Sequence, residues 1–121
     1  MNTPLELDKK ARSIGFSHYL DYLANSARWH LLRLTLTGKT CYCCGEWKAF
    51  WLLLHHISYE RLGRELPEDV ITLCRWCHDR CHELIWTKKA TLQNAHILVK
   101  AEMDAERLKG LHQPRLPLEA A

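Results

Sequence analysis

Residues 41–45 read CYCCG, and residues 74–82 read CRWCHDRCH. Each stretch holds one Cys-x-x-Cys pair, and the four cysteines concerned are Cys41, Cys44, Cys74 and Cys77. Two-residue spacing lets both thiolates of a pair contact one ion at about 2.3 Å, as in tetrahedral structural zinc sites. These residues therefore predict a structural Zn²⁺ site, which we favour over disulfides and over free thiols in the core.

The two pairs belong to different local structures. The first lies in a tight turn that contains glycine, and the second lies where a strand gives way to a helix, whose N-terminus favours thiolate. This arrangement is typical of a treble clef. The other two cysteines, Cys43 and Cys81, are more simply explained as small residues. Cys43 could replace Cys44 as a ligand, but Gly45 directly after Cys44 suits the turn better.

Four of the eight histidines form a second pattern. His55 and His56 are adjacent at the end of a predicted strand, and His78 and His82 are four residues apart on a predicted helix. Residues at i and i+4 share one helical face, so these two imidazoles can bind one divalent ion. His55 could complete a three-imidazole site, which would leave His56 free to act as a base. A strand alone sends neighbouring side chains to opposite faces, so the chain has to bend for both to reach one phosphate.

Length and composition suit one globular domain. The chain has 121 residues, of which 47% are hydrophobic and 26% charged. Its longest apolar run, residues 49–54, is far shorter than the ~20 residues of a membrane-spanning helix. No secretory signal is visible, which favours a cytoplasmic location, where reduced cysteines bind metals. The net charge is +3, but residues 41–82 hold five basic against six acidic side chains, so charge permits nucleic-acid binding without arguing for it.

Capping residues and apolar spacing predict helices on both sides of this core. Helix caps are predicted at Thr3, Ser17 and Ser26, with helix ends near Gly15 and Gly38. The rest of the pattern predicts a strand over 50–57, a loop over 58–69, a strand over 70–73, a helix over 75–86, a helix over 88–109 and an irregular tail. The five tryptophans are expected in the core rather than as stacking platforms for bases.

The stretch from Leu54 to Leu84, LHHISYERLGRELPEDVITLCRWCHDRCHEL, resembles HNH endonucleases of phage and bacterial type, which have a ββα-metal core. The upstream Cys-x-x-Cys-Gly and the pattern Tyr22-Leu23 … Ser26-x-x-Trp29-x-x-x-Arg33 are also similar, so the resemblance covers roughly residues 19–84. It implies an α+β fold with a treble-clef-like, zinc-stapled HNH core in a single domain, 1–121. Its parts would be a helical extension (1–39), the zinc-bound ββα core (40–86), a C-terminal helix (87–110) and a tail (111–121).

Residue by residue, the resemblance implies a nuclease site. His56 matches the general base that takes a proton from the attacking water. Asp69 falls where the family has an asparagine that orients the loop and this base. An aspartate can accept but not donate a hydrogen bond unless it is protonated, so this is a departure from the pattern. The ligands implied for one catalytic divalent ion (Mg²⁺, Mn²⁺, Ni²⁺ or Zn²⁺) are His55, His78 and His82.

The partner that the resemblance implies is DNA, which we expect to be double-stranded. Candidate phosphate contacts are Arg61, Arg64, Arg75 and Arg80, although each alone is better explained as a solvated surface residue. The expected activity is metal-dependent hydrolysis of phosphodiester bonds. Two alternatives stay open. One is a zinc-stapled module of the same fold that binds DNA without cutting it, with Asp69 marking lost catalysis. The other is an interaction domain in which the histidines are incidental.

Overall fold

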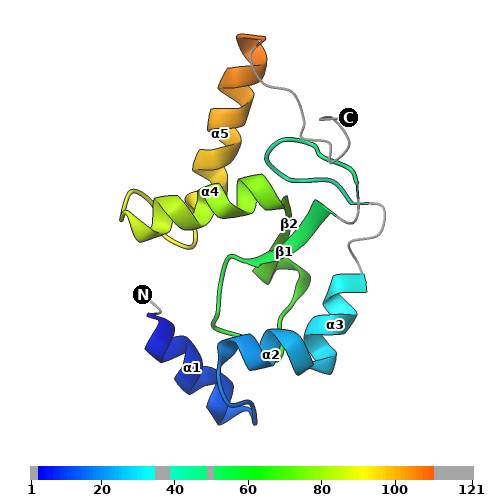
Figure 1. Cartoon of the computed structure of the whole chain (residues 1–121), viewed down its shortest axis with the longest axis vertical. Helices are drawn as coiled ribbons and strands as arrows, with labels where there is room; N and C mark the ends of the chain where they lie inside the picture. Colours follow the sequence, from blue (N-terminus) through cyan, green and yellow to red (C-terminus); the bar gives the residue numbers. More distant parts are fainter. Residues whose placement is uncertain (1–2, 35–38, 49–50, 111–121) are drawn as a thin grey trace.

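A two-stranded antiparallel sheet lies at the centre of the chain (Figure 1). β1 (Leu52–His56) pairs with β2 (Val70–Cys74), and the register sets Leu52 opposite Cys74 and His56 opposite Val70. The computed structural model describes residues 3–34, 39–48 and 51–110. Within these residues the architecture is mixed α+β, as the sequence predicts.

Five α-helices flank the sheet in the described part of the chain. They are α1 (Pro4–Ser13), α2 (Tyr19–Asn25), α3 (Ala27–Leu34), α4 (Arg75–Trp86) and α5 (Ala95–Leu108). A short 3₁₀ helix, η2 (Pro67–Asp69), precedes β2. In Figure 1, α1, α2 and α3 lie on one side of the sheet, and α4 and α5 lie on the other. No helix among the described residues is long and apolar enough to cross a membrane.

The first and third N-terminal caps are confirmed. The Glu6 N–H donates to Thr3 Oγ1 at 3.2 Å, and the Trp29 N–H donates to Ser26 Oγ at 3.1 Å. The predicted cap at Ser17 is wrong, because α2 begins one residue later, after His18.

The start of α2 is satisfied from another helix. The Tyr19 N–H donates to the Asp8 carboxylate of α1 at 2.9 Å, so a residue eleven positions away does the work of a local cap. This contact also fastens α1 to α2. The predicted helix end at Gly38 lies outside the described residues.

The C-terminal half follows the prediction with one correction. α4 spans the predicted 75–86, and β2 includes the predicted 70–73. The predicted strand over 50–57 is found as β1, while residue 50 lies outside the described part, as does the predicted tail after 110. The last helix does not start at Lys88, because this residue takes a left-handed φ of 59° that ends the helical path. Turns follow, and α5 begins at Ala95.

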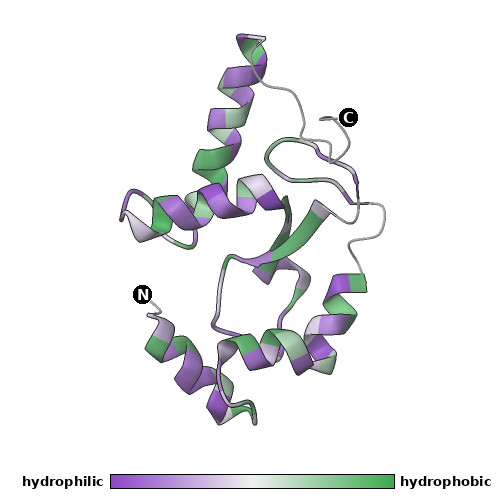
Figure 2. Ribbon diagram, viewed as in Figure 1, coloured by the Kyte–Doolittle hydropathy of each residue, from purple (hydrophilic) through white to green (hydrophobic). Residues whose placement is uncertain are grey.

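Two hydrophobic clusters lie on opposite sides of the sheet. One contains all six cysteines together with buried residues of β1, β2, α4 and α5. The other joins Ala11, Tyr22, Trp29 and Leu62, so it holds the N-terminal helices against the loop between the strands. Figure 2 shows β1 hydrophobic along most of its length, which fits a strand with a core on each face.

The expectation that the tryptophans are core residues is only partly right. Trp29 is 5% exposed, but Trp47 is 62% and Trp86 is 82% exposed. The last two side chains face solvent, and nothing in the hydrophobic pattern of the sequence distinguishes them from Trp29.

Candidate metal centres and the buried histidine network

The four cysteines predicted as zinc ligands form one buried cluster. Their sulfur atoms all lie within 4.8 Å of one another, and none of the four side chains is more than 2% exposed. The turn after the first pair ends at Gly45, which takes a left-handed φ of 83°. Cys74 caps the N-terminus of α4. Two segments thirty residues apart in the chain are thus joined at one point.

The spacing of the cluster is compatible with a tetrahedral zinc. A Zn–S distance of 2.3 Å implies sulfur atoms about 3.8 Å apart. Sγ of Cys44 and Sγ of Cys74 are 3.6 Å apart. Within each pair a backbone N–H donates to the first sulfur, from Cys44 to Cys41 at 3.5 Å and from Cys77 to Cys74 at 3.4 Å. These bonds stabilise thiolate, so the residues present fit a structural Zn²⁺.

The pKa values of the thiols shift in opposite directions. Hydrogen bonds from the Cys43 and Cys44 thiols hold the pKa of Cys41 far below its ordinary value. Hydrogen bonding to Cys41 in turn raises the pKa of Cys74. Opposite shifts are what crowded thiols give, because one thiolate opposes the ionisation of its neighbours. A divalent cation bound at this point would remove that opposition and allow all four to ionise.

The two remaining cysteines are buried beside the cluster. The Cys43 thiol donates to the carbonyl of His96 at 3.4 Å, which ties the zinc-site turn to α5. Cys81 is fully buried on α4. Neither belongs to the set of four sulfurs that share one position, which agrees with their interpretation as packing residues.

The three histidines predicted as metal ligands form a second cluster, between β1 and α4. The ligand nitrogens of His55, His78 and His82 all lie within 4.8 Å of one another. Nε2 of His78 and Nε2 of His82 are 3.2 Å apart, close to the ~3.3 Å expected between two nitrogens on one tetrahedral zinc. The rings of His55 and His78 meet edge to face at 5.4 Å. The i, i+4 spacing therefore does bring the two α4 imidazoles to one point, and β1 supplies the third.

The environment of this cluster keeps its imidazoles neutral. Burial, followed by the charges of His78 and His82, lowers the pKa of His55 to about 2. Burial also lowers the pKa of His78 and of His82. The Nε2 atom of His55 is buried and has no hydrogen-bond partner among the described residues. A buried polar atom without a partner costs free energy, and a metal ion at this point would satisfy it.

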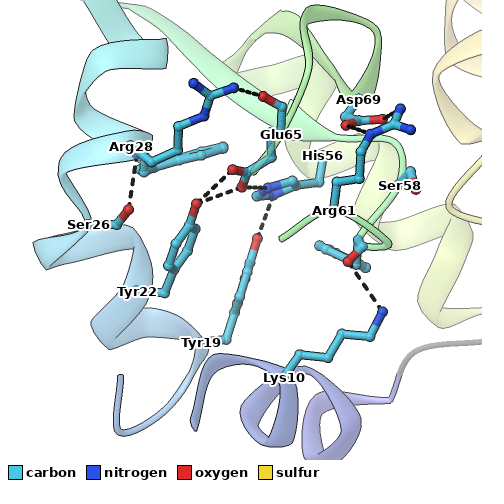
Figure 3. A network of polar contacts seen from close by, with 12 residues as sticks. Lys10, Tyr19, Tyr22, Ser26, Arg28, His56, Ser58, Arg61, Glu65 and Asp69 are labelled. Atoms are coloured by element: carbon cyan, nitrogen blue, oxygen red, sulfur yellow. Dashed lines mark hydrogen bonds and ion pairs between the residues drawn. The ribbon is translucent and has the colours of Figure 1, made fainter. Parts of the chain in front are cut away.

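His56 points to the other face of β1 and is held at both ring nitrogens (Figure 3). Nε2 lies 2.8 Å from Oε2 of Glu65, and Nδ1 lies 2.9 Å from the Tyr19 hydroxyl. The Tyr22 hydroxyl donates to the same carboxylate at 2.8 Å. The indole of Trp29 stacks on the imidazole with 4.5 Å between ring centroids. Figure 3 shows Tyr19 and Tyr22 approaching from α2 and Glu65 from the loop between the strands.

The chemistry of the partners sets the tautomer of His56. Burial alone would raise the pKa of Glu65, but hydrogen bonds from His56 and Tyr22 outweigh burial and lower it. An ionised carboxylate only accepts, so Nε2 of His56 carries the hydrogen. In the neutral imidazole Nδ1 then accepts from the Tyr19 hydroxyl. The expectation that His56 is free does not match this conformation, in which it is 3% exposed and both nitrogens are occupied.

Asp69 organises the loop before β2 without touching His56. Its Oδ2 accepts from the Leu66 N–H at 2.9 Å and from Nε of Arg61 at 2.8 Å, and its Oδ1 accepts from Nη2 of Arg61 at 2.6 Å. The Arg61 guanidinium holds the pKa of Asp69 below its ordinary value. All of these partners are donors, so an acceptor-only side chain suits the position. An aspartate rather than an asparagine at this position is therefore explained by Arg61, which donates to both of its carboxylate oxygens.

The four arginines predicted as phosphate contacts divide into two pairs. Arg61 is engaged by Asp69, and Arg80 makes a bidentate contact with Glu102 of α5 as well as a bond to Glu83. Arg64 and Arg75 are exposed, and their guanidinium groups have no hydrogen-bond or ion-pair partner within residues 3–34, 39–48 and 51–110. The charge of Arg75 contributes to lowering the pKa of His78, after burial, so it lies near the three-histidine cluster.

Sequence reasoning missed the residues that hold His56. No motif in the sequence links Glu65, Tyr19 or Tyr22 to His56. The one available signal was the i, i+3 spacing of the two tyrosines, which places both hydroxyls on one face of α2.

Known proteins give no match to this chain: no family model, no curated protein and no solved structure matches it. The chemistry of the two clusters and of the His56 network is therefore what a function has to explain.

Proposed function

We propose that this chain is a metal-dependent nuclease of the HNH type, built on a treble-clef-like ββα core that a structural zinc holds together. The observation that carries the proposal is the three-histidine cluster. A buried imidazole of β1 and two imidazoles of α4 converge on one point with neutral side chains and an unsatisfied nitrogen. A protein that needed only the zinc fold would have no use for this second set of ligands.

The histidine donor set suits a catalytic divalent ion. Such an ion, when bound, supplies Lewis-acid stabilisation of the charge that develops on a phosphodiester during hydrolysis. His55, His78 and His82 would hold it, and three protein ligands leave coordination positions for substrate and water. Arg75, three residues before His78 on α4 and exposed, would contact the phosphate backbone.

His56 remains the residue proposed as general base, and its network defines a condition for that role. A neutral imidazole accepts a proton at its hydrogen-free nitrogen, which is Nδ1 here. The Tyr19 hydroxyl occupies that nitrogen, so it has to move aside or pass a proton on before water can reach it. Glu65 would stabilise the imidazolium that forms, because its carboxylate lies 2.8 Å from Nε2.

A second function is favoured by the burial of the same residue. If Tyr19 and Glu65 never release His56, the chain is a zinc-stapled module that binds DNA without cutting it. The three-histidine cluster would then hold a second metal for stability only.

Plasmid nicking tests both proposals. Purified protein is incubated with supercoiled DNA and Mg²⁺, Mn²⁺, Ni²⁺ or Zn²⁺, beside an EDTA control and the variants His56→Ala and His78→Ala. The nuclease proposal expects metal-dependent nicking that both variants lose while the fold, followed by circular dichroism, is retained. Retained DNA binding without nicking under any metal would overturn it in favour of the binding module.

A further inference from the structure

Trp86 is the most exposed tryptophan of the described chain, at 82%. It closes α4 one turn after His82, so the two side chains share a helical face. A large aromatic ring exposed to water costs free energy through its apolar surface, and Trp86 belongs to neither hydrophobic cluster of the described residues. The ring thus extends the line of the α4 histidines away from the sheet.

A hollow of about 540 Å³ lies beside this ring. Its walls come from α4 and the residue after it: Asp79, His82, Glu83, Trp86 and Thr87. His82 lines this hollow and also belongs to the three-histidine cluster, so the two lie next to each other on α4. Glu83 pairs with Arg80 at 2.8 Å, which offsets part of its charge, and Asp79 lies 3.5 Å from Nδ1 of His78. Both carboxylates offer acceptors to amino groups.

Two lysines follow directly after the helix. Lys88 and Lys89 are both exposed, and neither ammonium group has a partner in the part of the chain that the structure describes. Backbone bonds to Ile85 and Leu84 hold this turn against the end of α4. The combination of an exposed indole and unpaired cations on one ridge is the pattern by which proteins bind single-stranded nucleic acid, with bases on the ring and phosphates on the cations.

We propose that the hollow at Trp86 binds one unpaired nucleotide of a DNA strand, next to the phosphate that reaches the three-histidine cluster. The base stacks on the indole, the carboxylates of Asp79 and Glu83 accept from its amino groups, and Lys88 and Lys89 contact the neighbouring phosphates. The substrate class is therefore DNA with an unpaired stretch, and not a continuous duplex. This inference deepens the proposed function and relies on it only for the cutting step.

Binding without added divalent metal tests the site apart from catalysis. The probes are a short fluorescein-labelled single-stranded DNA and the blunt duplex of the same sequence, followed by fluorescence anisotropy. We expect tighter binding of the single strand. Trp86→Ala should weaken single-strand binding about fivefold or more, which corresponds to ~1 kcal/mol or more for one stacked base, and Trp86→Phe should retain most of it.

Trp47→Ala is the matched control, because Trp47 is the other strongly exposed tryptophan and lies two residues after the turn that ends at Gly45. It should bind the single strand as the unmodified chain does. Equal losses in the two alanine variants, an unchanged affinity of Trp86→Ala, or equal weakening of single strand and duplex would each overturn the inference.

Cleavage of the same single-stranded and duplex probes, with divalent metal added, separates this inference from the proposed function. Cutting that Trp86→Ala leaves unchanged would refute the nucleotide site and keep the nuclease. Binding that depends on Trp86 in a protein that cuts nothing would keep the site and refute the nuclease.

Discussion

His55 and His56 are adjacent on β1, are both almost fully buried, and have opposite surroundings. His55 faces α4, where two more imidazoles meet it and its Nε2 lacks a partner among the described residues. His56 faces the N-terminal helices, where Glu65 and Tyr19 occupy both of its nitrogens. Two adjacent histidines therefore differ in kind: His55 belongs to a cluster that could hold a metal ion, and His56 is fully hydrogen-bonded.

The difference follows from the alternation of a strand. Neighbouring side chains leave a strand on opposite faces, so His55 meets the α4 imidazoles while His56 meets Tyr19 of α2. The face toward α4 leaves an imidazole neutral and incompletely bonded, which is the state a metal ligand needs. On the face toward α2 both imidazole nitrogens have hydrogen-bond partners, which holds the ring in one orientation. Four experiments test this difference between the two histidines.

The largest effect is expected from the zinc site. Cys77→Ala removes one of four ligands, and because a structural zinc contributes about 10 kcal/mol or more to folding, the variant should lose its cooperative unfolding transition. Both histidine environments would then disappear together. Zinc content and thermal unfolding measure the effect.

Cys81→Ala is the control for that change, since Cys81 is equally buried on α4 but lies outside the ligand set. It should keep one zinc per chain and a cooperative transition. Equal loss of zinc in both variants would contradict the assignment of the four ligands.

The next effect concerns the His56 side. Glu65→Gln removes a buried carboxylate that accepts from His56 and Tyr22, and should lower the free energy of unfolding by about 2 kcal/mol. The glutamine amide can donate, so the tautomer of His56 should shift toward hydrogen on Nδ1, which ¹⁵N chemical shifts report. Glu68→Gln, at an exposed carboxylate of the same loop, should change neither quantity. An unaltered tautomer in Glu65→Gln would speak against the assignment.

The pH dependence of stability tests the His55 side. The folded pKa of His55 is about 2, whereas an unfolded histidine titrates near 6.5, so only the unfolded state gains this proton as the pH falls below 6.5. Stability is therefore full above pH 6.5 and is lost toward acid. Between pH 7 and pH 5, His55 alone should remove about 2 kcal/mol when no metal occupies the histidine cluster.

Denaturant unfolding at several pH values measures this slope, with His55→Gln as the comparison. The variant should show a clearly shallower slope at the same zinc content. Parallel slopes in the two proteins would mean that His55 is not the group responsible.

The smallest effect is expected at Asp69. Asp69→Asn weakens the bidentate contact with Arg61 but keeps an acceptor for the Leu66 N–H, so the melting temperature should fall by only a few degrees. The variant also introduces the asparagine that HNH endonucleases, which the sequence resembles, carry in their motif. Nicking should rise if that asparagine orients the base, and an unchanged rate would show that Asp69 serves the loop alone.

The sequence predicted both clusters because their ligands are local. The Cys-x-x-Cys spacing and the i, i+4 histidine spacing each fix the distance between two side chains within about one turn. The single helix α4 carries Cys77, His78 and His82. The bounds of α4 were predictable for the same reason, since Cys74 is both a ligand and the helix cap. Only His55 had to be brought from another element, and a two-stranded sheet allows few positions for it.

What the sequence did not predict depends on packing between distant segments. Tyr19 is thirty-seven positions from His56 in the chain, and Arg80 is twenty-two from Glu102. These contacts exist because α2 packs on one side of the sheet and α5 on the other. Periodicity describes which face of a helix is apolar, but it does not say which polar atom will lie opposite. The late start of α5 differs, because its cause is local: Lys88 takes a left-handed φ of 59°.

The register between the strands has a consequence for folding fidelity. β1 reads Leu-Leu-Leu-His-His, so a shift by one residue would still place leucines over the core and would exchange the faces of His55 and His56. Side-chain pattern alone therefore discriminates poorly between the two alignments. The discrimination comes from the ends of the ladder: the cysteine cluster at Cys74, and the bond from the Ile57 N–H to the Asp69 carbonyl at 2.9 Å. A zinc ion bound by the four cysteines would thus also help to select the register, and a chain folded without it is expected to populate the misaligned hairpin, in which His55 and His56 exchange faces.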